Sequence, residues 1–254
     1  MRAARRPAAP AVRVASAGGV VRIVLGRGAA GNRLDGEMAA ALAEACADVG
    51  DRDDVRVVVL DHDPPDFCLG LPAGCSWPDP AWPDAVAAVA SLPQPVIAVV
   101  GGTAARWGLG LALACDLRVA AATATLRVDA DAGFPGGGLT QRLPRLVGPA
   151  RALELLLVGR ALRGREAAAW GLATAVAPAS AVRATADALA RGLAARGPTA
   201  LRYAKEAVVR ALDLALDDGM RLEHDLYVLL QTTADRREGV AAFRARRPPR
   251  FRGR

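Results

Sequence analysis

The amino-acid sequence predicts an α/β protein in which a parallel-sheet core is followed by a helical C-terminal region. Two apolar runs, Val55–Leu60 (interrupted by Arg56) and Val96–Val100, have the length and composition of strands buried on both faces of a parallel sheet. Segments with helical periodicity separate such strands in the first half of the chain, whereas the last third consists almost entirely of helical patterns. This order indicates a βαβ core with a helical subdomain behind it.

The first elements are predicted by turn and cap residues. Val12–Val14 and Val20–Leu25 are β-rich runs on either side of Gly18-Gly19, which favours a hairpin. Asp35 then stands where a helix N-cap is expected, and an apolar face of helical spacing follows it as far as Val49.

The remaining elements follow from periodicity and proline placement. We expect a helix over Pro80–Leu92 with its prolines in the first turn, a short helix over Trp107–Cys115, and strands at Leu117–Ala121 and Thr125–Val128. One later strand, Ala173–Ala177, interrupts a series of predicted helices: Thr140–Val147, Ala150–Val158, Arg165–Trp170, Ala179–Ala195, Thr199–Leu216 and Asp218–Thr232.

These elements divide the chain into three expected parts. Residues 1–10 are basic and rich in Ala and Pro, which predicts a flexible tail. Residues 11–195 form the expected core, and residues 196–254 the helical region. Because no apolar run reaches the roughly 18 residues of a membrane span, and the N-terminus lacks the apolar stretch of a secretory signal, we expect a cytoplasmic protein without membrane contact.

Cysteine spacing and charge narrow the function classes. Cys46, Cys68, Cys75 and Cys115 show no metal-binding spacing, so we expect buried free thiols and no metal site.

The net charge of +7 comes almost entirely from scattered arginines, because Lys205 is the only lysine. A basic surface suits nucleic acid or an anionic ligand, but the sequence contains no recognition helix or aromatic platform for nucleic acid. We therefore expect no nucleic-acid partner.

Four ordered blocks resemble the enoyl-CoA hydratase/isomerase (crotonase) family. They are the turn Asp66–Leu71, the strand and helix from Pro95 to Asp116, the Gly-rich turn and helix from Pro135 to Gly148, and the tail from Asp235 to Phe251. The first block is similar to the family's A-F-C-A-G-x-D pattern. The second is similar to its K-P-V-I-A-A-V-N-G strand followed by the G-G-G-x-E-L-A-x-x-C-D helix. The third is similar to its P-G-x-G-x-T-Q-R-L pattern, and the fourth to its C-terminal tail. This resemblance covers nearly the whole chain after residue 20 and implies a crotonase-type ββα spiral core with a helical C-terminal subdomain.

The resemblance also implies a substrate and a way of activating it. Family members bind acyl-CoA thioesters, so coenzyme A enters as part of the substrate and no separate cofactor is expected. Two backbone N–H groups stabilise the negative charge on the thioester oxygen. By resemblance these donors are Leu71 and Trp107, although the family favours Gly where Trp107 stands. The implied substrate-binding residues are Ala30, Asn32, Leu69, Gly70, Gly108, Gly110 and Phe134.

The family's acid–base residues are missing. Hydratases of the family use two glutamates, but Gly110 occupies the position of the first, and no Glu lies in the stretch expected to supply the second. Asp129 and Asp131 are the only acids nearby, and either is a candidate replacement or part of a solvated loop tied to Arg127. Pro72 likewise stands where the family often has Asp.

Several hypotheses therefore remain open at the level of sequence. The first is an acyl-CoA enzyme in which hydration is less favoured than isomerisation, decarboxylation or thioester hydrolysis. The second is a catalytically silent homologue that binds acyl-CoA or assists a partner enzyme. The third, nucleic-acid binding, has the least support. The family resemblance further implies a homotrimer or dimer of trimers built through the C-terminal helices, with the arginines of the tail near the CoA phosphates.

Two other groups are interpreted as structural. We predict that Asp116 anchors a helix or loop, and that His62, with Asp61 and Asp63, forms a surface cluster at a strand end.

Overall fold

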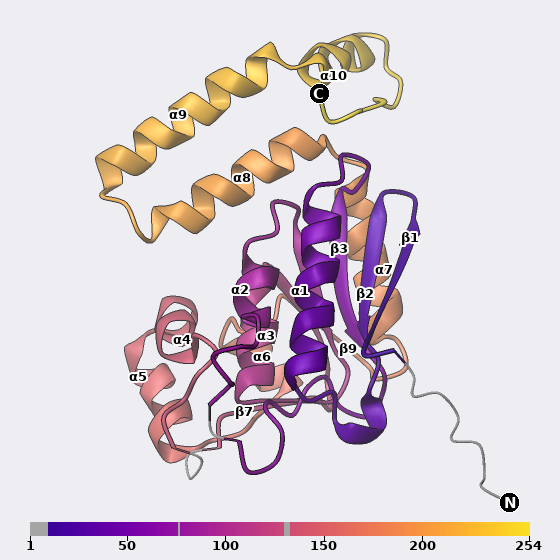
Figure 1. Cartoon of the computed structure of the whole chain (residues 1–254). Coiled ribbons are helices and arrows are strands. Elements are labelled where there is room, and N and C mark those ends of the chain that lie inside the picture. The colour runs from indigo at the N-terminus through magenta and orange to yellow at the C-terminus, as the bar shows by residue number, and fades with distance from the viewer. Residues whose placement is uncertain (1–9, 76, 130–132) are drawn as a thin grey trace, which may run out of the picture.

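A six-stranded sheet forms the centre of the core in the computed structural model, which describes residues 10–75, 77–129 and 133–254 (Figure 1). Its spatial order is β1-β2-β3-β4-β6-β9. The strands are β1 Val12–Ala17, β2 Val20–Leu25, β3 Val57–His62, β4 Val96–Val100, β6 Leu117–Ala121 and β9 Ala175–Ala177. The pairing of β1 with β2 is antiparallel, and all other neighbours in this sheet are parallel. Every residue of β3 and β4 is buried, and the apolar sequence predicted this for Val57–Leu60 and Val96–Val100.

Helices cover both faces of this sheet. Helices α1 (Gly36–Gly50) and α2 (Ala85–Ala90) lie in front of it in Figure 1, and α7 (Val182–Ala194) lies behind it. The Asp35 carboxylate accepts a hydrogen bond from the Met38 N–H at 2.8 Å, which confirms the expected N-cap of α1.

The helix expected over Pro80–Leu92 is shorter than predicted. It begins at Ala85 because the Asp84 carboxylate caps it, accepting from the N–H groups of Val86 and Ala87. Pro80 and Pro83, which were expected in the first turn of the helix, lie in the segment that precedes this cap. The hairpin prediction is confirmed, since Gly18 and Gly19 both have positive φ between β1 and β2.

A second, three-stranded sheet crosses the end of the first and was only partly predicted. It consists of β5 Thr103–Ala105, β7 Thr125–Arg127 and β8 Leu162–Arg163, in the order β5-β7-β8. Strands β5 and β8 escaped prediction because two or three residues are too few to show a period. Cys68 forms a bridge with Ala104, so the chain leaving β3 continues alongside β5.

The helices between the core and the C-terminal layer depart from prediction at two points. The expected helix Ala150–Val158 is an α-helix followed by a π-helix, α5 (Pro149–Leu153) and η3 (Glu154–Val158). The helix expected to continue to Leu216 ends at Ala211, and α10 (Ala234–Arg244) was not predicted. The remaining helices are α3 Trp107–Ala114, α4 Leu139–Val147, α6 Gly164–Ala169, α8 Pro198–Ala211 and α9 Leu216–Thr232, with the short 3₁₀ turn η1 Gly28–Ala30.

Helices α8, α9 and α10 form a layer above the core in Figure 1. Lys205 of α8 attaches this layer to the sheet: its Nζ lies 2.7 Å from a carboxylate oxygen of Asp116, which also accepts from the Val96 N–H at 2.7 Å. The predicted anchoring role of Asp116 is therefore confirmed. No helix within the described ranges is long and apolar enough to cross a membrane.

We predict that Asp116→Ala lowers the free energy of unfolding by about 2–3 kcal/mol. The change leaves the Val96 N–H without its acceptor and removes the carboxylate partner of the Lys205 ammonium, which keeps only the Gln94 carbonyl. Urea unfolding measures the change. The control Asp218→Ala removes an exposed ion pair with Arg221 in α9 and should cost less than about 1 kcal/mol. Equal losses in the two variants would contradict the anchoring role.

Candidate functional site

The residues expected to carry the two oxyanion donors lie side by side. The Cys68 N–H donates to the Thr103 carbonyl at 3.1 Å, and the Ala105 N–H donates to the Cys68 carbonyl at 3.0 Å. Two residues beyond this pairing, Gly70 adopts a φ of 86°. A Cβ on Gly70 would lie only 3.2 Å from the Ala105 carbonyl oxygen and 3.5 Å from the Trp107 nitrogen. The turn before Leu71 thus abuts the start of α3, and this contact requires glycine.

The two backbone N–H groups are available for a ligand. Among the hydrogen bonds of the described residues, neither the Leu71 N–H nor the Trp107 N–H donates to another group of the protein. Both residues are buried. Trp107 is the first residue of α3, so its N–H also lies at the positive end of the helix dipole. Two unpaired donors in one buried place can stabilise a developing oxyanion.

The turn at residues 27–34 packs against the first of these segments. The Leu69 N–H donates to the Gly31 carbonyl at 2.9 Å, and the Leu34 N–H donates to the Gly70 carbonyl at 2.8 Å. Arg33 holds the same segment through its guanidinium group, which donates to the carbonyls of Leu69 and Leu71. Sequence reasoning missed Arg33, although its position directly after Asn32, one of the implied substrate-binding residues, was the available signal.

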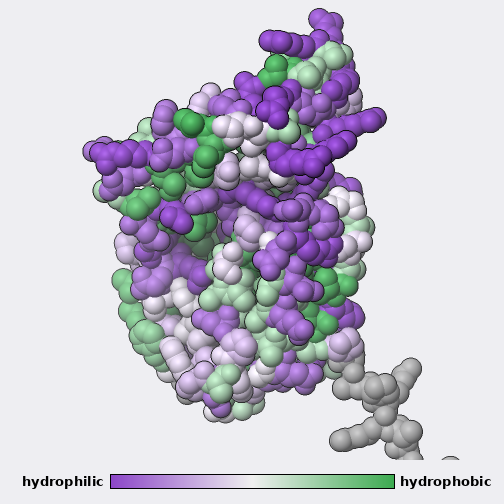
Figure 2. All heavy atoms as spheres, turned by 45° about the horizontal axis from the view of Figure 1, so that its top comes forward, coloured by the Kyte–Doolittle hydropathy of each residue, from purple (hydrophilic) through white to green (hydrophobic). Residues whose placement is uncertain are grey.

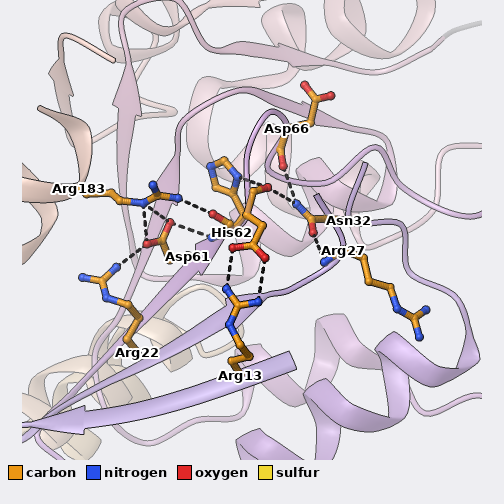
Figure 3. A network of polar contacts seen from close by, with 9 residues as sticks. Arg13, Arg22, Arg27, Asn32, Asp61, His62, Asp66 and Arg183 are labelled. Atoms are coloured by element: carbon orange, nitrogen blue, oxygen red, sulfur yellow. Dashed lines mark hydrogen bonds and ion pairs between the residues drawn. The ribbon is translucent and has the colours of Figure 1, made fainter. Parts of the chain in front are cut away.

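Asn32 shapes this turn from inside the protein. Its side chain is fully buried: Oδ1 accepts from the Arg27 N–H, and Nδ2 donates to the carbonyls of Asp63 and Asp66 (Figure 3). These three bonds occupy the carboxamide, so its contribution to a ligand site is the shape of the turn. Ala30, at the end of η1, is exposed and lies where the turn meets solvent.

The Trp107 ring packs into the protein. It makes an edge-to-face contact with Trp77, with ring centroids 5.4 Å apart. A Cβ on Gly136 would lie 2.2 Å from the ring, so the Gly136-Gly137 backbone covers the indole directly. The ring is buried, and Nε1 has no hydrogen-bond partner among the residues that the structure describes.

The glycines of α3 leave no space for side chains. A Cβ on Gly108 would lie 2.1 Å from the Cys68 carbonyl oxygen, and one on Gly110 would lie 2.4 Å from the Gly137 carbonyl oxygen. The position expected for the first catalytic glutamate therefore lacks a carboxylate and is also filled by the neighbouring backbone. A glutamate at this position requires the Gly136–Gly138 turn to move.

The structure places Asp129 close to the second oxyanion segment. The Arg106 N–H donates to the Arg127 carbonyl at 3.1 Å, which brings the end of β7 beside the residue before Trp107. The Asp129 carboxylate, two residues further on, is partly exposed and forms an ion pair with Arg127. Asp131 lies outside the described residues. Phe134 is 70% exposed, so its side chain is not part of a buried pocket.

The interpretation of His62 as part of a surface cluster is wrong. Asp61 and His62 are each only 3% exposed, because α7 and the loop after β3 cover the end of that strand. Asp61 binds Arg22 of β2 and Arg183 of α7, while Asp63 pairs with Arg13 of β1 (Figure 3). Burial lowers the pKa of His62 below its usual value.

Three of the four thiols are buried. Cys46, Cys68 and Cys115 are buried, and burial raises the pKa of each to about 12. Cys75 is half-buried and free. Within the part of the chain that the structure describes, no three His, Cys, Asp or Glu side chains are grouped as metal ligands.

Comparisons with known proteins agree with the resemblance. The family described as enoyl-CoA hydratase/isomerase matches residues 15–254. (E)-Benzylidenesuccinyl-CoA hydratase from Thauera aromatica is 36% identical over 248 residues, covering 92% of this chain and 96% of that protein. Mitochondrial methylglutaconyl-CoA hydratase from Rattus norvegicus is 44% identical over 172 residues, 65% of this chain, and the match spans only about half, 54%, of that relative's length.

Solved structures extend the similarity to nearly the whole chain. The crystal structure of an enoyl-CoA hydratase from Bacillus anthracis superimposes with a TM-score of 0.90 at 34% identity. It covers 96% of this chain and 100% of that one. A second, from Geobacillus kaustophilus, gives a TM-score of 0.88 at 35% identity, with 96% and 98% covered.

We predict that Gly110→Ala destabilises the protein by about 1–3 kcal/mol, because the new methyl group collides with the Gly137 backbone. The control is Gly192→Ala in α7, where a Cβ meets nothing within 4 Å. That exposed helical site should gain up to about 1 kcal/mol from the better helix former. Thermal unfolding of both variants distinguishes the two sites. If Gly110→Ala leaves the stability unchanged, the Gly136–Gly138 turn can move aside at little cost, and the prediction is wrong.

Proposed function

Because the chain belongs to the enoyl-CoA hydratase/isomerase family, we propose that it binds an acyl-CoA thioester and stabilises the thioester enolate with the N–H groups of Leu71 and Trp107. The observation that carries this proposal is the convergence of the two segments at Gly70, where neither N–H group donates to another group of the described residues. Removing one such donor typically costs roughly 3–4 kcal/mol of transition-state stabilisation. Backbone donors do not depend on side-chain identity, so Trp107 serves in place of the usual glycine.

The thioester carbonyl is the group that this site would activate. When a base removes a proton from the carbon next to the carbonyl, the electron pair moves onto the oxygen and forms an enolate. Donors that are already fixed in place stabilise that charge without reorganising. Arg33, which binds the carbonyls of Leu69 and Leu71, would hold the first donor in position.

The proton-transfer groups favour a reaction with one acid–base residue. A two-glutamate hydration mechanism is disfavoured because the Gly137 backbone fills the space beside Gly110. Asp129, next to the end of β7, is our candidate base, and its carboxylate forms an ion pair with Arg127. Isomerisation of a double bond needs only one such group, and decarboxylation generates the enolate by loss of carbon dioxide. Asp131 remains a second candidate.

A catalytically silent acyl-CoA-binding homologue is the alternative. The absence of both glutamates and the bulky Trp107 at the oxyanion turn favour it. In that case the unpaired N–H groups bind the thioester carbonyl without promoting any proton transfer. Binding of an acyl-CoA without chemistry at its α-carbon would identify this alternative.

We also propose that residues 196–254 form an oligomerisation region, as in the expected homotrimer or dimer of trimers. Figure 2 shows hydrophobic side chains gathered on the helical layer above the core. In α8 and α9 the exposed apolar residues include Val208, Val209, Leu212, Leu216, Met220, Tyr227, Val228 and Leu229. Such an extended apolar surface is typical of a protein–protein interface.

The first test is exchange of the α-proton. Incubation of the protein with butyryl-CoA in D2O should place deuterium on the α-carbon, detected by mass spectrometry, because a stabilised enolate forms whichever overall reaction follows. Asp129→Asn should slow this exchange by at least about 100-fold if Asp129 is the base.

The control is Asp54→Asn, which disrupts an Arg–Asp ion pair of the same two-residue spacing on the exposed surface. It should leave the rate unchanged. Butyryl-CoA binding without exchange in the unmodified protein would support the silent homologue, and no binding of butyryl-CoA or free coenzyme A would overturn the proposed function.

The second test concerns assembly. Val208→Glu places a charge on the exposed face of α8 and should reduce the mass measured by sedimentation to that of a monomer, because burying an unpaired carboxylate in an interface is unfavourable. Val14→Glu changes an exposed valine of β1 and should leave the mass unchanged. A monomeric unmodified protein would contradict the proposed assembly.

A further inference from the structure

The contacts of His62 connect the two segments that carry the oxyanion donors. Its Nε2 accepts a hydrogen bond from the Gly101 N–H at 3.1 Å, at the end of β4. Its ring meets the Phe67 ring edge to face, with centroids 5.7 Å apart. Phe67 leads directly to Cys68 and the Leu71 segment, whereas Gly101 leads through β5 to Trp107. His62 thus touches the start of both segments.

The hydrogen bonds assign the tautomer of His62. Because Nε2 accepts the Gly101 N–H, it carries no proton, and Nδ1 must carry one instead. Nδ1 lies 3.2 Å from the Asp63 carbonyl oxygen and donates to it. The imidazole is therefore neutral in the folded protein, and a second proton on Nε2 would eliminate the bond to Gly101.

The space around Gly101 is occupied by this imidazole. A Cβ on Gly101 would lie 2.8 Å from Nε2 and 3.2 Å from Cε1. The family pattern that Pro95–Gly102 resembles has Asn at the position of Gly101, and an Asn side chain cannot fit there while His62 is present. The imidazole of His62, at the end of β3, thus occupies the space that a side chain at position 101 would occupy.

A second link runs parallel to His62. The Asp66 carboxylate accepts from the Thr103 N–H at 3.0 Å, and the Asp66 carbonyl accepts from Asn32. This link fixes β5 relative to the loop after β3 but does not reach the end of β4. His62 holds the N–H of Gly101 at the start of the turn from which the second donor segment departs. The Gly102 carbonyl of the same turn accepts from the Thr125 N–H at 3.3 Å.

We propose that His62 is a positioning residue that sets the separation of the Leu71 and Trp107 N–H groups by holding the Gly101 backbone, in place of the Asn of the family pattern. This inference rests on the proposed function, since the separation matters only if the two N–H groups share one oxyanion. A displacement of about 1 Å in such a site can cost roughly 100-fold in rate.

Several charged groups surround the imidazole. The backbone carbonyls of Asp63 and Asp66 in the following loop and the carboxylate of Asp61 favour protonation, while Arg183 of α7 disfavours it. Arg22 neutralises Asp61, and Arg13 neutralises Asp63. Burial is the largest influence and lowers the pKa of His62 below 6.5.

The pH dependence follows from this direction. Because the unfolded chain takes up the proton first as the pH falls, the stabilisation that neutral His62 provides is complete above its unfolded pKa of about 6.5. It is lost as the pH falls through the lower pKa of the folded protein.

The test is a double-mutant cycle of His62→Ala, Gly101→Asn and the two combined. His62→Ala leaves the Gly101 N–H without an acceptor, and Gly101→Asn alone collides with the imidazole. In the combined variant the carboxamide enters the vacated space. Each single change should lower kcat for α-proton exchange by about tenfold or more with little change in KM, whereas the combined variant should recover to within about threefold of the unmodified protein.

The pH profile separates positioning from mere stability. As the pH falls through the lowered pKa of His62, kcat should fall in the unmodified protein but not in the combined variant, which has no imidazole at this place. Asp116→Ala serves as a control, because it destabilises the opposite end of β4 and should leave kcat unchanged below its unfolding temperature.

Two outcomes would overturn the inference: single changes that lower the melting temperature without changing kcat, or effects that simply add in the combined variant.

If the unmodified protein shows no exchange at all, the proposed function fails. The positioning role is then judged by the infrared shift of a 13C-labelled thioester carbonyl in bound crotonyl-CoA. That shift should decrease in each single variant and return in the combined one, and the same shift in all four proteins overturns the inference.

Discussion

The candidate site depends on the pairing of Cys68 with β5. Two backbone hydrogen bonds, from Cys68 to Thr103 and from Ala105 to Cys68, align the chain leaving β3 with the chain leaving β4. Beyond this pairing the first segment turns at Gly70 and the second enters α3, so both expose an N–H at the same place. Rigid backbone pairing is well suited to hold donors for an oxyanion, because the donors need no rearrangement when charge develops.

Close backbone approach explains why this region contains so much glycine. Gly70 meets the Ala105 carbonyl, Gly108 meets the Cys68 carbonyl, and Gly110 meets the Gly137 carbonyl, each at a distance that excludes a side chain. The same tight packing that supports the donors also removes the position of the first expected acid. The proposed scaffold for thioester binding is therefore separable from the groups for proton transfer. Asp129, two residues beyond the strand end that contacts Arg106, is the described acid considered for that role.

The polar network at the carboxyl end of β3 holds together the segments that border the candidate site. Asp61 connects β3 with Arg22 and Arg183, His62 holds Gly101, and Asn32 connects the turn at residues 27–34 with the loop after β3. The side chains of Asp61, His62 and Asn32 are buried, and each makes hydrogen bonds inside the protein. Buried polar groups that are fully paired rigidify their surroundings, so this network fixes the relative positions of all three segments that border the proposed ligand.

The sequence by itself determined the sheet strands, the cap at Asp35, the Gly18-Gly19 hairpin and the family, because these features depend on local periodicity and short motifs. Tertiary structure decided the rest. Strands β5 and β8 are too short to show a pattern, and the start of α2 depended on whether Asp84 caps it. The burial of His62 was decided by α7, which is more than 100 residues away in the chain. Contacts between residues so distant in sequence leave no local pattern, and for that reason the sequence showed which donors to expect but not what holds them together.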